Sequence, residues 1–139
     1  MPSPPPDVRA VRILIADDHR LFAESLMTVL GDDDRVDVVG IAENGQEAVD
    51  LGLQLRPDVI LMDLRMPVVD GFEATRRLRA ASFDAQILIL TGVNEEIGSE
   101  DAAAAGANGF VRKEDGLVEL QQVFFEVALL ASVLGPAPR

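Results

Sequence analysis

The sequence contains no cysteine, one histidine and one lysine among its 139 residues. The absence of cysteine excludes disulfide bonds, thiolate metal sites and thiol nucleophiles, and a single histidine, His19, excludes a metal site built from several imidazoles. Basic residues are scarce as well: 12 Lys and Arg stand against 24 Asp and Glu, which gives a formal net charge of -12. Because an acidic surface repels phosphate backbones and anionic lipids, direct binding to nucleic acid or to a membrane is not expected.

Long apolar runs are also missing. No stretch approaches the roughly 18 residues needed to span a bilayer, and residues 1–10 hold no apolar signal core but several prolines, which indicates a disordered lead-in. Hydrophobic residues still make up 48% of the sequence, enough for one core of ordinary size. We therefore expect a single cytoplasmic domain over residues 11–133, followed at 134–139 by a tail or the start of a linker.

Five short apolar runs alternate with segments of helical periodicity. Most of the runs are continuous, which is typical of parallel strands buried on both faces. The expected strands are Val11–Ala16, Val36–Ala42, Val59–Met62, Ile87–Leu90 and Gly109–Val111, and the expected helices are His19–Leu30, Gln46–Leu55, Gly71–Ala80, Glu95–Ala105 and Asp115–Val133. Strict alternation of strand and helix predicts an α/β fold of the (βα)5 type, a parallel sheet with helices on both faces.

Polar residues follow four of the expected strands. In an open parallel sheet, ligands bind beyond the carboxyl ends of the strands, so residues at these ends should meet at one edge. These residues are Asp17 and Asp18 after the first strand, Asp63 after the third, Thr91 after the fourth, and Arg112 and Lys113 after the fifth.

Three carboxylates close together repel one another unless a cation compensates them. Oxygen-only ligands, without histidine or cysteine, favour Mg²⁺ over zinc or copper, and Mg²⁺ commonly binds one or two carboxylates together with a phosphate. One carboxylate is then free to act as a nucleophile, and Asp63 is the best candidate because it stands alone after the central strand. The ammonium of Lys113 and the hydroxyl of Thr91 could each contact a phosphoryl oxygen.

Each of these residues also has an ordinary structural explanation. An Asp-Asp pair at a strand end often caps a helix or lies in a solvated turn, and a single strand-end Asp, Thr or Lys carries little information. The combination is more informative, because four strands supply complementary groups at one edge. We expect His19 in the first turn of a helix and not as a phosphoryl donor.

The stretches around these residues match a known family. The succession ILIADDH, VILMDLRMPVVDGFE, ILILTG and GFVRKED resembles the receiver domain of bacterial two-component response regulators, over about Val11 to Val133. The DDH opening, and a lysine that is not followed by proline, are closest to receivers of the branch with LuxR-type helix-turn-helix output domains. The resemblance implies a flavodoxin-like three-layer sandwich with sheet order 2-1-3-4-5. It implies a phosphorylatable switch and not a metabolic enzyme.

The resemblance assigns roles to the acidic residues. Asp63 corresponds to the phosphoacceptor, and Asp17 and Asp18 correspond to the acidic pair that positions Mg²⁺. Arg65, two residues beyond Asp63, would give its backbone carbonyl to the metal. The implied phosphoryl donor is a sensor histidine kinase.

Further roles follow from the same resemblance. Thr91 corresponds to the switch hydroxyl, Lys113 to the phosphate-binding lysine, and Phe110 to a mobile aromatic residue. Arg65 and Val93 occupy positions that influence hydrolysis of the phosphoryl group. Because neither side chain offers a carboxylate or amide to orient water, we expect a long-lived phosphorylated state. The fourth helix, fifth strand and fifth helix would then present an altered surface, which controls transcription through a DNA-binding domain absent from this chain.

The last two expected helices are unusual. The fourth holds few large apolar residues, and Gly98 costs about 1 kcal/mol relative to alanine in a helix, so a short, mobile or partly unwound helix is expected. The last helix has more apolar residues than one core-facing stripe needs, among them Val118, Phe125 and Leu129. They could form an interface, such as a homodimer that assembles on phosphorylation, or simply a wide buried stripe.

Other functions use similar residues or the same topology, including a flavodoxin-like cofactor protein, but no Ser/Thr/Gly-rich phosphate loop follows the first strand here. A Mg²⁺-dependent phosphohydrolase of the haloacid-dehalogenase kind also uses a strand-end aspartate, but those enzymes need a second acid where Arg65 stands. A receiver-like interaction module that works without phosphorylation remains the alternative, although such modules usually lose an acidic residue or the lysine.

Overall fold

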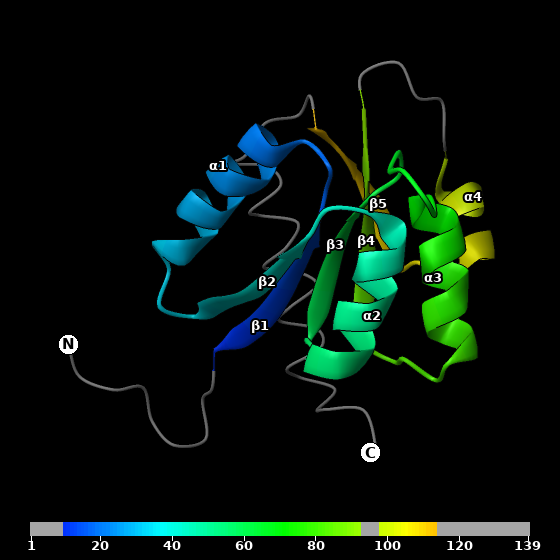
Figure 1. Cartoon of the computed structure of the whole chain (residues 1–139), viewed down its shortest axis with the longest axis horizontal. Helices are drawn as coiled ribbons and strands as arrows, with labels where there is room; N and C mark the ends of the chain where they lie inside the picture. Colours follow the sequence, from blue (N-terminus) through cyan, green and yellow to red (C-terminus); the bar gives the residue numbers. More distant parts are fainter. Residues whose placement is uncertain (1–9, 93–97, 114–139) are drawn as a thin grey trace.

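The computed structural model describes residues 10–92 and 98–113. This part of the chain folds into alternating strands and helices (Figure 1). The strands are β1 (Val11–Ala16), β2 (Val36–Ala42), β3 (Val59–Asp63), β4 (Gln86–Thr91) and β5 (Gly109–Arg112), and the helices are α1 (Arg20–Gly31), α2 (Gly45–Leu55), α3 (Gly71–Ala80) and α4 (Ser99–Ala105). The strands pair in parallel in the order β2-β1-β3-β4-β5, so the predicted α/β fold and sheet order are confirmed.

Both faces of the sheet are covered, which explains the continuous apolar runs. On one face, Ile13 and Ile15 of β1 pack with Ala23, Leu26 and Leu30 of α1. On the other face lie α2, α3 and α4 (Figure 1), which pack on alternate strand residues: Leu14, Ala16, Ile60, Met62, Ile87 and Ile89. Because successive strand residues point to opposite faces, a strand covered on both sides must be apolar at nearly every position.

The predicted element bounds differ from the structure mainly at their ends. The third, fourth and fifth strands each continue to the polar residue that follows the apolar run, Asp63, Thr91 and Arg112. The fourth helix begins at Ser99 and not at Glu95, and it is seven residues long, as short as expected. Residues 93–97 and the predicted last helix lie outside the described residues. None of the described helices is long and apolar enough to cross a membrane.

Arg79 of α3 joins three segments at the amino-terminal edge of β4 and β5. Its Nε donates to the Gly106 carbonyl at 2.8 Å, its Nη1 to the carbonyls of Phe83 and Ala85 at 2.7 Å each, and its Nη2 to the Asn108 side chain at 2.9 Å. Gly106 has a φ of 101°, and a Cβ there would lie 2.8 Å from the Arg79 Cγ. The half-buried guanidinium therefore fixes α4 and the start of β5 against α3.

Replacing Arg79 by methionine is expected to destabilise the protein by about 2 kcal/mol, because the four acceptors lose charge-assisted hydrogen bonds. Urea denaturation measures the effect. Arg77→Met is the matched control: Arg77 lies on the same helix, and its hydrogen bond to Gln46 and its ion pair with Glu73 are exposed, so its loss should cost less than about 0.5 kcal/mol. Equal losses in the two variants would show that the Arg79 contacts contribute no more than a surface arginine.

Candidate functional site

The carboxyl ends of four strands meet at one edge of the sheet. The strand register sets Ala16 beside Met62, Asp63 beside Leu90 and Thr91 beside Arg112. The predicted convergence of polar strand-end residues is therefore present in the fold.

Lys113 bridges two of the carboxylates. Its Nζ lies 2.7 Å from Asp17 Oδ2 and 3.3 Å from Asp63 Oδ1. The ammonium also lies 4.6 Å from the centre of the Phe22 ring on α1, a cation–π contact. The sequence indicates Lys113 but not Phe22, because only the tertiary fold brings this ring of α1 beside the ammonium.

The surroundings of Asp63 disfavour the ionised form of its carboxyl group. Its side chain is 2% exposed and that of Asp17 is fully buried. Burial, followed by the negative charge of Asp17, raises the pKa of Asp63 from 3.8 to about 7, against the opposing effect of Lys113. A cation at this edge would offset the Asp17 charge, the second of the two causes that raise this pKa.

Three buried oxygens at the site accept no hydrogen bond of good geometry from the described residues: Asp63 Oδ2, Thr91 Oγ1 and Asp17 Oδ2. Asp17 Oδ2 lies 2.7 Å from Lys113 Nζ, so the ion pair compensates this atom in part. Buried polar atoms normally have partners, so Asp63 Oδ2 and Thr91 Oγ1 indicate a site for a ligand. A carboxylate-rich, oxygen-based set of donors fits Mg²⁺.

His19 lies one position before the helix in which the sequence predicts it. It is the N-cap residue before α1 and not a residue of its first turn. Its backbone N–H donates to Asp17 Oδ1 at 2.8 Å, and its ring Nδ1 lies 3.2 Å from the same oxygen. The ring thus joins the acidic cluster, a position that helical periodicity alone could not reveal.

The loop from β3 to α3 packs tightly behind Asp63. Gly71 N–H donates to the Leu64 carbonyl at 2.8 Å, and a Cβ on Gly71 would lie only 2.3 Å from the Asp63 carbonyl oxygen. Val68 in this loop has a φ of 73°, a region that β-branched residues rarely adopt. Arg65 lies in the same loop, and the metal-binding role of its carbonyl stays a prediction.

The remaining predicted site residues are only partly described. Phe110 is half-buried on β5, packs against the core cluster on the face covered by α2, α3 and α4, and has the Arg112 guanidinium 6.0 Å from its ring. Its role as a mobile switch residue stays a prediction. Val93 and the apolar residues predicted as an interface lie outside the described residues.

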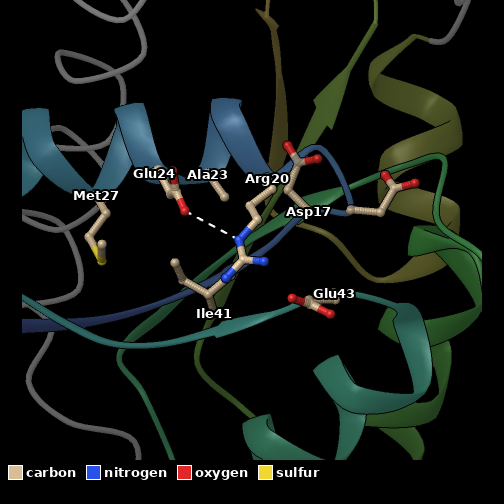
Figure 2. A pocket seen from close by; sticks show the side chains of 8 residues that line it. Asp17, Arg20, Ala23, Glu24, Met27, Ile41 and Glu43 are labelled. Carbon is tan, nitrogen blue, oxygen red and sulfur yellow. Dashed lines mark hydrogen bonds and ion pairs between the residues drawn. The ribbon is translucent and has the colours of Figure 1, made fainter.

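A hollow of about 290 Å³ lies beside the acidic cluster, between α1 and the end of β2 (Figure 2). Its lining residues are Asp17, Asp18, Arg20, Ala23, Glu24, Met27, Ile41 and Glu43. Arg20 and Glu24, one turn apart on α1, form an ion pair on the helix side of the hollow, with 3.3 Å between Nε and Oε1. Two members of the acidic cluster are themselves exposed, with side-chain exposures of 35% for Asp18 and 65% for His19.

Known proteins are similar to this chain in both sequence and fold. Residues 13–125 match the family model described as the response regulator receiver domain. The response regulator GacA of Pseudomonas viridiflava is 38% identical over 112 residues, which are 81% of this chain and 52% of GacA. The transcriptional regulatory protein DegU of Brevibacillus brevis is 39% identical over 116 residues, 81% of this chain and 49% of DegU. The chain thus spans about half the length of these curated relatives.

Solved structures agree with this assignment. The signal receiver domain of the putative response regulator NarL from Mycobacterium tuberculosis superposes with a TM-score of 0.80 at 31% identity, over 86% of this chain and 97% of that one. A LuxR-family two-component response regulator from Aurantimonas sp. SI85-9A1 gives a TM-score of 0.75 at 34% identity, over 86% of each chain. The chain belongs to the receiver domain family of two-component response regulators, whose members act as phosphoacceptor switches.

Proposed function

We propose that Asp63 is the phosphoacceptor of this receiver domain and that the donor is the phosphohistidine of a sensor histidine kinase. An oxygen of Asp63 attacks phosphorus in line, the new O–P bond forms, and the N–P bond to the kinase histidine breaks. The observation that carries the proposal is the asymmetry of this carboxylate: Oδ1 lies 3.3 Å from Lys113 Nζ, while Oδ2 is buried without a hydrogen-bond partner.

Several surrounding groups would compensate the negative charge of Asp63 and of the phosphoryl oxygens. Asp17, Asp18, Asp63 and the Arg65 carbonyl would hold Mg²⁺, which when bound offsets charge on the phosphoryl oxygens. Lys113, already beside Asp63 Oδ1, would contact a phosphoryl oxygen from the other side. Its position over the Phe22 ring limits where the ammonium can move.

The same site would then drive a change of surface. The Thr91 hydroxyl is fully buried and without a hydrogen-bond partner among the described residues, so a phosphoryl oxygen offers it an acceptor. Movement of Thr91 would let Phe110 reposition on β5, which alters the surface of α4 and β5. The output would be transcription, through a DNA-binding domain outside this chain, as the transcriptional regulator DegU suggests.

Intact mass after treatment with a small phosphodonor tests the proposal. Wild type should gain one phosphoryl group only with Mg²⁺, and Asp63→Ala should gain none. Asp37→Ala is the matched control, because Asp37 is an exposed aspartate on β2, away from the site. Phosphorylation of Asp63→Ala to the same extent as wild type would place the phosphoacceptor elsewhere.

An absent adduct needs one further measurement, because acyl phosphates hydrolyse readily. Beryllofluoride with Mg²⁺ forms a non-covalent phosphoryl mimic. It should shift the backbone amide NMR signals of Thr91 and Lys113. No adduct and no spectral response together would favour the interaction module that works without phosphorylation.

A further inference from the structure

The only imidazole of the chain lies within the predicted metal site. His19 Nδ1 is 3.2 Å from Asp17 Oδ1, 3.6 Å from Asp18 Oδ1 and 3.8 Å from Asp63 Oδ2. One possible ligand atom from each of these four residues lies within 4.8 Å of every other. Asp63 Oδ2 is the second observation that points to a ligand here, because it is buried and accepts no hydrogen bond from the described residues.

These distances fit a shared metal ion. Ligands about 2.1 Å from an octahedral ion are separated by about 3.0 Å when adjacent and about 4.2 Å when opposite. All three distances from His19 Nδ1 to the carboxylate oxygens lie within that range. The imidazole could therefore join the carboxylates around one ion after only small side-chain movements.

The local backbone holds the ring in this position. His19 is extended, with φ of -85° and ψ of 92°, and its N–H donates to Asp17 Oδ1. Without a metal, Nδ1 can carry the ring proton and donate it to Asp17 Oδ1, which lies 3.2 Å away. The side chain is 65% exposed, so the proton can instead reside on a hydrated Nε2 when Nδ1 binds an ion. The helix cap itself does not need the ring, because the His19 side chain makes no capping hydrogen bond.

We infer that His19 is a further metal ligand, which gives this site a preference for first-row transition ions such as Mn²⁺ or Co²⁺ beyond that of a site with oxygen ligands alone. Imidazole nitrogen suits transition ions, whereas Mg²⁺ prefers oxygen donors. The inference rests on the metal site of the proposed function and adds one residue and a selectivity to it.

A competing role for the ring is to serve Lys113. Lys113 Nζ lies 3.4 Å from His19 Nδ1, so this nitrogen could instead accept a hydrogen bond from the ammonium. In that role, His19 would not touch the ion. The two roles predict different spectra for a bound paramagnetic metal.

Pulsed EPR of bound Mn²⁺ separates these roles, with untagged protein so that His19 is the only histidine present. Wild type should show coupling of Mn²⁺ to an imidazole ¹⁴N, and His19→Asn, which offers an amide oxygen in place of the ring nitrogen, should not. Mn²⁺ bound without ¹⁴N coupling in wild type would overturn the inference and leave the proposed function intact.

Calorimetric titration with Co²⁺ and Mg²⁺ at about pH 8 gives the selectivity, since a free imidazole is neutral there. The ratio of Co²⁺ to Mg²⁺ affinity should fall at least about tenfold in His19→Asn. Asp18→Asn should weaken both metals, which separates loss of a shared ligand from loss of selectivity. An unchanged ratio in His19→Asn would contradict the inference, and failure of wild type to bind Mg²⁺ would contradict the metal site of the proposed function itself.

Discussion

Replacing Asp63 by asparagine is expected to stabilise the metal-free protein at about pH 8 by about 4 kcal/mol. The raised pKa of Asp63, about 7 against 3.8, means that ionising this carboxylate costs about 1.4 kcal/mol per pKa unit in the folded state. Between these two values the folded protein binds more protons than the unfolded chain, so stability falls as the pH rises through this window. Asparagine does not ionise and avoids the cost.

The difference between wild type and variant carries the test, because other groups also titrate. Urea denaturation in chelator from about pH 4 to about pH 8 should show this difference growing with pH and levelling off above about 7. Asp37→Asn, an exposed aspartate on β2, is the control and should show no such growth. Mg²⁺ added at about pH 8 should stabilise wild type but not Asp63→Asn. A constant difference between wild type and Asp63→Asn across the range would mean that Asp63 is not destabilised by its burial.

Gly71→Ala is expected to destabilise the protein by about 3 kcal/mol and to slow phosphorylation at least about tenfold. A Cβ at this position would lie 2.3 Å from the Asp63 carbonyl oxygen and 2.9 Å from the Leu64 Cα. Both are backbone atoms, so neither can rotate away as a flexible side chain could. The strand end that carries Asp63 must shift, and the carboxylate shifts with it.

Gly31→Ala is the matched control for this substitution. Gly31 ends α1, and an added Cβ would meet no atom within 4 Å. Alanine there should be neutral or stabilising by up to about 1 kcal/mol, with phosphorylation unchanged. Denaturation and the rate of adduct formation measure both variants. If Gly71→Ala behaved like Gly31→Ala, the close approach behind Asp63 would be unimportant for the site.

Much of the fold could be predicted because its signals are local. The apolar run Val59–Met62 has to be a strand covered on both faces, and Asp63 follows it directly. Parallel pairing then brings the strand ends to one edge, so the predicted meeting of Asp17, Asp63 and Lys113 needed no detail of packing.

The other contacts depend on packing between segments distant in sequence. Arg79 reaches Gly106 and Asn108 only because α3 and α4 lie side by side, and nothing at position 79 distinguishes it from the exposed Arg77. Helix α4 starts at Ser99, later than the predicted Glu95, because acidic residues at 95–96 resemble a first helical turn as much as those at 100–101 do. The N-cap of this helix is Gly98.

The Lys113 amine has a consequence for chemical modification. It is the only lysine side chain in the sequence, and it lies between Asp17, Asp63 and the Phe22 ring. Any acylation of a lysine side chain in this chain therefore occurs at Lys113, within the candidate site. It would neutralise the ammonium and leave two buried carboxylates without their nearest cation. For this protein, a lysine-directed reagent is also a reagent for the switch.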